Sequence, residues 1–225
     1  MNKNLLGISA KIGCGKDTFF EILQEKTLNG YENKKFAGKL KVIASILTNI
    51  PVENFENQDF KKTFLPDDWS YLPKDEILTD GIGLMMKKMT VREFLQKLGT
   101  EAMRDNLHTN VWVNALFSDY KSIFYKESDD FAKRVSFEDM IIKRNNFEYH
   151  PSWCITDMRF PNEYDAIKSK NGIVIRINRP GVPVNDHPSE TALDNFKFDY
   201  IINNDGTLED FKIKVEDCLK HFNII

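Results

Sequence analysis

The sequence predicts an α/β protein whose parallel sheet is covered by helices on both faces. Short apolar runs alternate with longer segments of helical periodicity, as in a parallel sheet with crossover helices. A glycine-containing turn follows the first apolar run and opens the first helical pattern. The 225 residues are 41% hydrophobic and 29% charged, which is typical of a globular chain with one well-buried core.

The composition excludes several classes of protein. The 31 basic and 34 acidic residues give a net charge of −3. The chain therefore has no excess of basic residues of the kind that would indicate a nucleic-acid polymer as its partner. Cys14, Cys154 and Cys218 are too widely spaced for a metal motif or a disulfide framework and favour a reducing compartment. The start lacks a signal-peptide pattern, and no apolar stretch is long enough to span a membrane. We therefore expect a cytoplasmic protein without a membrane partner.

The first fifty residues predict two strand–helix pairs. Residues 5–9 form an apolar strand and residues 10–15 a turn. The helix that follows has apolar residues at Phe19, Phe20, Ile22 and Leu23. A second short strand near residues 34–37 precedes a helix over residues 40–50, which ends before Pro51.

The middle of the chain is less regular. Residues 52–89 hold several turns, and Asp80-Gly81 between apolar pairs favours a hairpin or an irregular insertion. Residues 90–104 predict a helix that opens with a capping box from Thr90 to Glu93. Its apolar face holds Val91, Phe94, Leu95, Leu98 and Ala102. A second helix is expected from about residue 110 past Tyr120.

The second half predicts three more strands. Residues 126–150 are charge-rich and are interpreted as a surface insertion. A strand over residues 153–156 ends at Asp157, and Pro161 opens the next helix. A strand over residues 172–177 leads into a loop. After a last strand at residues 200–202, the final helix is expected to face inward with Leu208, Phe211, Val215 and Leu219.

The strongest chemical signal is the loop over residues 10–18, Ala-Lys-Ile-Gly-Cys-Gly-Lys-Asp-Thr. Gly13 and Gly15 allow the backbone to curl so that its N–H groups converge on phosphate oxygens. The helix that follows adds a favourable dipole for anions, and Lys16 can reach the β- and γ-phosphates. The alternative is a plain glycine turn between a strand and a helix.

The loop departs from the usual phosphate-binding pattern G-x-x-x-x-G-K-[ST] at two positions. Ala10 replaces the first glycine, and Asp17 replaces the hydroxyl residue that contacts Mg²⁺. Asp17 is expected to hold the ion directly or through water. Thr18 lies about 100° further round the helix, so it is no automatic substitute.

Asp157 is the second signal, because an acidic residue at the carboxyl end of an inner strand is where such proteins place a further Mg²⁺ or water contact. The alternative is that Asp157 caps the helix opened by Pro161.

Arginines form a third signal, since Arg stabilises transferring phosphates by forked hydrogen bonds. Arg159 and Arg179 follow strand ends, and Arg176 alternates within a strand, which favours a structural role. The wider set is Arg92, Arg104, Arg159, Arg176 and Arg179.

Weaker candidates remain. Lys39 and Lys41 follow the second strand, where they would meet an acceptor phosphate or form the polar face of the next helix. Trp112 and Tyr120 fit a helix core better than a base-stacking platform. Glu190 lies beside His187 in an expected lid, as a substrate contact or a surface residue.

With these residues in view, the chain resembles the bacteriophage deoxynucleoside monophosphate kinases, within the nucleoside monophosphate kinase fold. The loop at residues 13–18 is shared with many kinases. The run Thr-Asp-Met-Arg-Phe-Pro-Asn-Glu at residues 156–163, together with Ile-Asn-Asn-Asp-Gly-Thr at residues 202–207, is far more specific. Further matching runs are Phe-Ala-Gly-Lys-Leu-Lys at 36–41, Arg-Glu-Phe-Leu-Gln-Lys-Leu-Gly-Thr-Glu at 92–101 and His-Pro-Ser-Glu at 187–190.

The resemblance implies a P-loop three-layer fold with a five-stranded parallel sheet, a helical lid and an acceptor-binding arm. We expect one domain over residues 1–225, with an acceptor-binding insertion at about 38–126, a surface insertion at about 127–150 and a lid at about 179–196. It also implies that aspartate at position 17 is normal for the family, and that similar proteins are often homodimers.

The expected activity is transfer of the γ-phosphate of ATP to a deoxynucleoside monophosphate, with Mg²⁺. Lys16, Arg159 and Arg179 are the expected catalytic residues, and Asp17 and Asp157 the expected metal contacts. The donor is expected at Ile12, Gly13, Cys14, Gly15, Lys16, Asp17 and Thr18, and by resemblance at Asn204 and Gly206 near adenine. The acceptor is expected at Phe36, Ala37, Lys39, Lys41, Arg92, Arg104, Trp112, Asp157, Arg159 and Glu190. The alternatives are a dephospho-coenzyme A kinase relative or a non-catalytic nucleotide-binding module.

Overall fold

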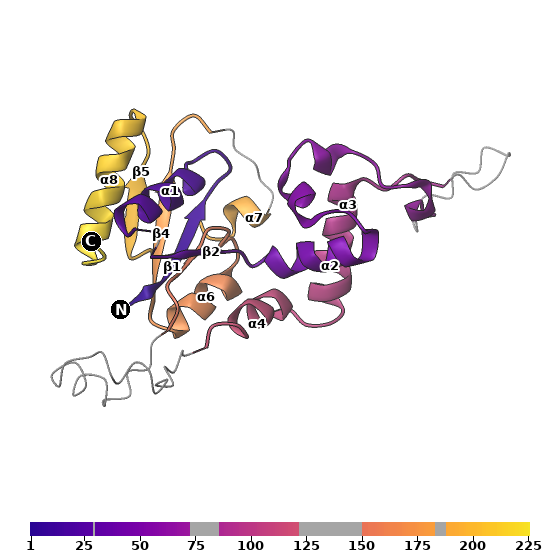
Figure 1. Cartoon of the computed structure of the whole chain (residues 1–225), viewed down its shortest axis with the longest axis horizontal. Coiled ribbons are helices and arrows are strands. Elements are labelled where there is room, and N and C mark those ends of the chain that lie inside the picture. Colours follow the sequence, from indigo (N-terminus) through magenta and orange to yellow (C-terminus); the bar gives the residue numbers. More distant parts are fainter. Residues whose placement is uncertain (29, 73–85, 122–149, 183–187) are drawn as a thin grey trace, which may run out of the picture. The chain divides into compact units, whose positions relative to one another are not determined.

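The computed structural model describes residues 1–28, 30–72, 86–121, 150–182 and 188–225 (Figure 1). They divide into a sheet unit, Met1–Phe36 with Ala115–Ile225, and a helical unit, Ala37–Asn114. The expected hairpin turn at Asp80-Gly81 lies outside the described residues, as do all but the last residue of the expected surface insertion and part of the expected lid.

The sheet unit contains a five-stranded sheet in the order β2-β3-β1-β4-β5. Every neighbouring pair is parallel, which confirms the predicted fold class. The strands are β1 Asn2–Ala10, β2 Glu32–Lys34, β3 Trp153–Ile155, β4 Gly172–Asn178 and β5 Tyr200–Asn203. Because all strands run the same way, their carboxyl ends meet at one edge of the sheet.

The second strand was predicted two to three residues too late. β2 ends at Lys34, whereas residues 34–37 were expected to be extended. The amide of Phe36 donates to the carboxylate of Asp157 at 2.8 Å rather than to a strand neighbour. A side-chain acceptor from beyond β3 therefore ends the ladder at this point.

Helices cover both faces of the sheet (Figure 1). On one face, α1 Lys16–Lys26 packs against α8 Leu208–His221. The core on this face combines the alternate strand residues Leu6, Ile8, Ile173, Ile175, Ile177 and Ile202 with helix residues Phe19, Ile22, Leu23, Phe211, Val215 and Leu219. On the other face, α6 Pro161–Ser169 packs against β1 and β4.

The first residue of the final helix faces solvent, contrary to prediction. Leu208 is 56% exposed, whereas Phe211, Val215 and Leu219 are buried as expected. Thr207 caps this helix by accepting from the amide of Asp210. Because helical side chains lean toward the N-terminus, the side chain of Leu208 extends past the first turn rather than onto the core.

The helical unit starts with α2 Gly38–Thr48, close to the predicted helix over residues 40–50. Residues 52–69 form three short 3₁₀ turns, Val52–Glu56, Phe60–Lys62 and Asp67–Trp69. Two antiparallel bridges follow, Phe64 with Thr90 and Tyr71 with Lys87. Of the two forms weighed for residues 52–89, the described part is thus an irregular insertion closed by short antiparallel pairing.

The predicted helix over residues 90–104 changes its winding part-way. α3 Val91–Gln96 is α-helical, and η4 Lys97–Asp105 continues it as a π-helix. Val91 and Phe94 are buried with Ala44, Phe55 and Leu65, whereas Ala102 is exposed. The next helix, α4 Val111–Phe117, is shorter than expected and ends before Tyr120.

Only half of the predicted capping box forms at Thr90. The Thr90 hydroxyl accepts from the amide of Glu93 at 3.1 Å. The Glu93 carboxylate instead accepts a short hydrogen bond from the hydroxyl of Tyr71, and Lys87 lies 3.5 Å away. The Tyr71 hydroxyl and the Lys87 ammonium hold the pKa of Glu93 below its ordinary value, against the opposing effect of burial.

The close contact between β1 and α6 depends on a glycine. A Cβ atom on Gly7 would lie 2.5 Å from Cδ1 of Ile167. We expect Gly7→Ala to lower the free energy of unfolding by about 1–3 kcal/mol, because an added methyl overpacks this layer. Urea denaturation of Gly7→Ala, Ile167→Val and the double variant measures the effect. Because Ile167→Val removes the clashing methyl, the double variant should lose less free energy of unfolding than the two single variants lose together. A loss in the double variant equal to or larger than that sum would contradict this packing.

The Tyr71–Glu93 contact makes a pH-dependent contribution to stability. A carboxylate with a lowered folded-state pKa stabilises the fold above its unfolded pKa, and this stabilisation is lost as the pH falls through the folded pKa. We expect Tyr71→Phe to cost about 1 kcal/mol near neutral pH, and the difference from the unaltered protein to shrink below about pH 4.

Urea denaturation across this pH range tests the prediction, with Tyr31→Phe as the control. The Tyr31 hydroxyl donates to the carbonyl of Lys3 at 2.7 Å, and that carbonyl does not titrate. The loss caused by Tyr31→Phe should therefore stay constant, and a constant loss for Tyr71→Phe would contradict the role of Glu93.

Candidate active site

The loop between β1 and α1 has the backbone geometry of an anion site. Gly13 and Gly15 have φ values of 82° and 103°, in the left-handed region that favours glycine. Gly15 is the N-cap of α1 and has no side chain to accept from the first helical amides. These N–H groups and the positive end of the helix dipole are therefore available to a bound anion.

Asn204 supports this loop from the end of β5. Its side-chain amide donates to the carbonyl of Cys14 at 3.0 Å, and its backbone amide donates to the carbonyl of Asn178 at 2.7 Å. A Cβ on Gly15 would lie 3.0 Å from the Asn204 amide nitrogen and 3.3 Å from the Phe211 ring. The loop is thus supported by Asn204, which directly follows β5, and by Phe211 of α8.

Buried polar side chains collect near the carboxyl edge of the sheet. Within the described ranges, they are Ser9, Thr156, Glu163, Arg176, Glu190 and Asn204. Arg176 donates to Ser9 at 2.8 Å and to Asp194 at 2.6 Å, which confirms its interpretation as structural. Buried polar groups need partners, and Asp194 connects Arg176 to Lys11 of the loop.

Arg159 lies at this edge and contacts two acidic side chains. Its backbone amide donates to Glu163 at 2.7 Å, and its guanidinium forms a short ion pair with Glu190. The other Glu190 oxygen accepts from the amide of Ile12 at 3.1 Å. The structure therefore brings Arg159 and Glu190 together with the phosphate loop, although Glu190 was predicted as a substrate contact or a surface residue.

Asp157 follows β3, as predicted, and accepts from the amide of Phe36 at 2.8 Å. The Phe36 ring is buried and packs edge-on against Phe117 at 6.1 Å between centroids. The Glu163 carboxylate accepts from the amides of Arg159 and Phe160 at the start of α6. The helix-capping function that was weighed for Asp157 is thus supplied by Glu163.

The other loop residues remain accessible. Lys16 has a side-chain exposure of 22%, and its ammonium lies 3.8 Å from the carboxylate of Asp17. Asp17 is 71% exposed, as expected for a side chain that meets a ligand rather than the core. Arg179 donates to the carbonyl of Gly13 at 3.3 Å, which places it beside the loop. Thr18 is half-buried, Ile12 is exposed, and Gly206 lies in the exposed turn before α8.

A hollow of about 410 Å³ lies beside the loop within the sheet unit. Basic side chains and aromatic rings line it together. The lining includes Lys11, Cys14, Arg179, Val182, Phe196 and Phe198. This mixture of apolar walls and a few polar groups is typical of a small-molecule site.

The predicted acceptor residues of the helical unit differ in their surroundings. Lys41 pairs with Glu56 at 2.5 Å, and Arg92 donates to Gln58 at 3.1 Å from an exposed position. Trp112 is 5% exposed and donates to the carbonyl of Gly99 at 2.9 Å, which favours its helix-core alternative. Of the other three, Ala37 is the N-cap of α2, Lys39 lies in α2 and Arg104 in η4.

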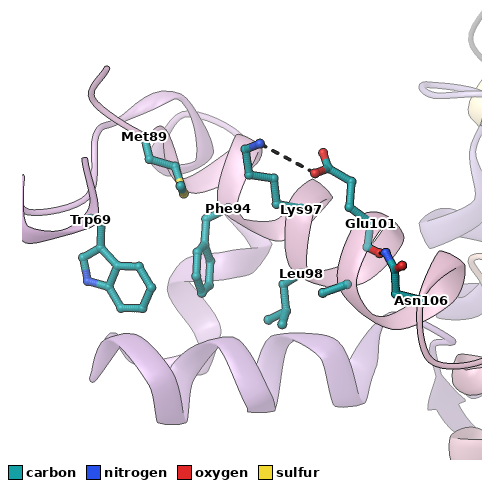
Figure 2. Close-up of a pocket in the computed structure, with 8 residues that line it drawn as sticks. Trp69, Met89, Phe94, Lys97, Leu98, Glu101 and Asn106 are labelled. Atoms are coloured by element: carbon teal, nitrogen blue, oxygen red, sulfur yellow. Dashed lines mark hydrogen bonds and ion pairs between the residues drawn. The ribbon is translucent and has the colours of Figure 1, made fainter. Parts of the chain in front are cut away.

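The hollow drawn in Figure 2 belongs to the helical unit and has a volume of about 360 Å³. Trp69 and Phe94 meet edge-on at 4.9 Å between ring centroids, and Lys97 pairs with Glu101 at 3.6 Å. Its remaining lining is Met89, Leu98, Ala102 and Asn106. None of these eight residues was predicted to bind the acceptor.

Comparison with known proteins agrees with the geometry around the loop. The sequence model for deoxynucleotide monophosphate kinase matches residues 68–215. A protein of Acanthamoeba polyphaga mimivirus, provisionally named as a deoxynucleotide monophosphate kinase, is 30% identical over 218 residues, which are 96% of this chain and 95% of that protein. The chain belongs to the deoxynucleotide monophosphate kinase family. The resemblance seen in the sequence motifs is thereby confirmed.

Two phage members of the deoxynucleotide monophosphate kinase family match a shorter part of the chain. The deoxynucleotide monophosphate kinase of Enterobacteria phage T4 is 28% identical to this chain over 144 residues, which are 64% of this chain and 51% of that protein. That of Escherichia phage RB69 is 26% identical over 146 residues, with the same two shares. Among solved structures, a dephospho-CoA kinase from Campylobacter jejuni aligns over 97% of this chain and 96% of that chain, with a TM-score of 0.39 and 16% identity.

Sequence reasoning missed two carboxylates that support the elements around the loop. Glu163 is the third residue of a helix opened by proline, and an acidic residue at that position is a capping signal that would have identified it. Asp194 pairs with both Arg176 and Lys11, at 2.6 and 3.1 Å, and no local sequence pattern marks it.

No helix in the described parts of the chain is both long and apolar enough to cross a membrane.

The support that Asn204 gives the loop leads to a binding prediction for this family member. Asn204→Ala leaves the buried carbonyl of Cys14 without its partner and loosens the loop. We expect ATP affinity to fall roughly 5- to 150-fold, as for the loss of about 1–3 kcal/mol from one buried hydrogen bond. Calorimetric titration with ATP measures it, with the exposed Asn114→Ala as the control. Equal affinity in both variants would contradict a supporting role.

Proposed function

We propose that the protein is a kinase that transfers the γ-phosphate of ATP to a deoxynucleoside monophosphate, giving ADP and the diphosphate. The observation that carries the proposal is the uncapped start of α1 with Lys16, next to Arg159 at the carboxyl edge of the sheet. Family membership supports the same reaction. The named phage relatives supply the acceptor class that the proposal extends to this chain.

The donor would bind through the loop. The amides of Gly13 and of residues 15–18 would surround the phosphates, and Lys16 would supply a point charge at the β- and γ-oxygens. Arg159 and Arg179 would stabilise the charge on the group in transfer. Because the acceptor is already a phosphate anion, positioning and charge account for most of the catalysis. The hollow beside the loop, with Phe196 and Phe198, offers apolar walls for the donor nucleoside.

Mg²⁺ fits the carboxylates at this edge. The ion commonly takes one or two carboxylates together with substrate phosphates rather than a full protein cage. Accordingly, no group of three metal-binding side chains is needed, and the described residues hold none. Asp17, exposed at the loop, would hold the ion, with Asp157 as a contact through water. When bound, Mg²⁺ would neutralise part of the phosphate charge.

The helical unit is proposed as the acceptor-binding arm, and residues 179–196 as the lid. Phe36, Ala37, Lys39, Lys41, Arg92 and Arg104 are the proposed acceptor contacts in or beside the arm. Closure of the lid would exclude water and limit hydrolysis of ATP. We further propose a homodimer in the host cytoplasm with small nucleotides, not nucleic-acid polymers, as ligands.

An assay of ADP release tests the activity. Mg-ATP is supplied with each deoxy- and ribonucleoside monophosphate in turn, and turnover is expected with at least one deoxynucleotide. Dephospho-coenzyme A is included as an acceptor because the alternative weighed from the sequence is a relative of dephospho-coenzyme A kinase. ATP binding without transfer to any acceptor would instead indicate a non-catalytic nucleotide-binding module.

Variants of the two loop lysines test how the reaction is carried out. We expect Lys16→Ala to lower kcat by roughly 100- to 1,000-fold, since it removes a charge that acts in the transition state. Lys11→Ala is the matched control, because Lys11 lies in the same loop but pairs with Asp194 at 3.1 Å. Equal loss in both variants would show that charge near the loop matters rather than the position of Lys16.

A further inference from the structure

Two buried carboxylates from different elements converge on Arg159. Glu163, in the first turn of α6, holds its backbone amide. Glu190, on α7 Pro188–Thr191, pairs with its guanidinium. They are 3% and 6% exposed, and the rest of the described chain contains no other buried acidic residue. Both buried acids therefore act on the same arginine.

The second oxygen of Glu190 connects this pair to the phosphate loop. It accepts from the amide of Ile12 at 3.1 Å, so one carboxylate bridges the loop and the guanidinium. Burying a carboxylate is unfavourable unless it is paired and hydrogen-bonded, and Glu190 needs both contacts at a side-chain exposure of 4%. Arg159 keeps a side-chain exposure of 28%, so a ligand at the loop can reach it.

We propose that Glu190 is a positioning residue that fixes the guanidinium of Arg159 beside the phosphate loop for the phosphoryl group in transfer. This inference rests on the proposed function, since it concerns the same site. Donors stabilise a transition state best when they are oriented before the reaction. A free arginine side chain loses considerable rotamer entropy when it is ordered. Because the ion pair with Glu190 orders the Arg159 side chain when the protein folds, this entropy is lost during folding and not during substrate binding.

The competing explanation is that Glu190 merely anchors the α7 segment, and Asp194 provides the comparison. Asp194 lies four residues further along and pairs with Arg176 at 2.6 Å and with Lys11 at 3.1 Å. Asp194 therefore connects the chain segment that contains α7 to β4 through Arg176 and to the loop through Lys11, without using Arg159. If anchoring were the only role, neutralising either carboxylate would have the same effect on the reaction.

The experiment compares Glu190→Gln and Asp194→Asn by steady-state kinetics with Mg-ATP and a deoxynucleoside monophosphate. We expect Glu190→Gln to lower kcat roughly 10- to 100-fold, as for a catalytic group displaced by about 1 Å. KM for ATP should change less than about threefold, because ground-state binding by the loop is kept. Asp194→Asn should lower kcat less than Glu190→Gln does, because it leaves the ion pair between Arg159 and Glu190 in place.

A second comparison uses Arg159→Ala as the background. If Glu190 acts through Arg159, adding Glu190→Gln to Arg159→Ala lowers kcat no further, because the two residues act as one unit. Thermal unfolding is followed for every variant. Should Glu190→Gln fail to fold, Glu190→Asp replaces it, since it keeps the charge but shortens the reach, and the same dependence on Arg159 is expected.

Three results would overturn the proposal: an unchanged kcat in Glu190→Gln, an equal loss in Asp194→Asn, or a full additional loss in the Arg159→Ala background. Each of these requires that the unaltered protein turns over normally. Absence of transfer by the unaltered protein is a different outcome, because it removes the proposed reaction itself and not only the role of Glu190.

Discussion

The turn from β1 into α1 is the constraint on which the rest of the sheet unit depends. The backbone has to reverse through residues 10–15 while leaving the first amides of α1 unpaired, and only positive φ values at Gly13 and Gly15 allow it. Unpaired amides are tolerated at a surface but not in a core. The loop therefore has to lie at the edge of the sheet, where the parallel strands end together.

The packing around the loop follows from the same constraint. A loop without regular hydrogen bonds needs other partners, and Asn204 supplies one by binding the carbonyl of Cys14. The sheet below is apolar on both faces, so polar partners can come only from its carboxyl end. Ser9 and Arg176 are buried near that end, and Arg176 pairs with Asp194, which also binds Lys11 of the loop. At the site, the sheet unit thus changes from the dispersion contacts of its core to a hydrogen-bonded network.

The sequence predicted what depends on local pattern and missed what depends on distant contacts. Alternation and the loop indicated the parallel sheet, and motif resemblance indicated the strand number. β2 was misplaced because the amide of Phe36 is bound by Asp157, a residue 121 positions away in sequence. The change to a π-helix at Lys97 is likewise absent from any local propensity, and so is the pairing of Glu93 with Tyr71. Of the site, the loop and Arg159 were recognisable, whereas the bridge through Glu190 requires the tertiary structure.

The charge balance at the carboxyl edge bears on how a polyanion would bind there. Arg159, Arg176 and Lys11 already pair with carboxylates at close range, which orients them but reduces their net field. Lys16, at 3.8 Å from the exposed Asp17, is the cation at the loop with the loosest pairing of these. The dipole of α1 adds roughly half a unit charge, which cannot neutralise a nucleoside triphosphate. Under the proposed function, a divalent cation at Asp17 would convert the most exposed negative group of the loop into part of the binding site. Binding the metal together with the phosphates is therefore the role that we propose for the aspartate that departs from the usual loop pattern.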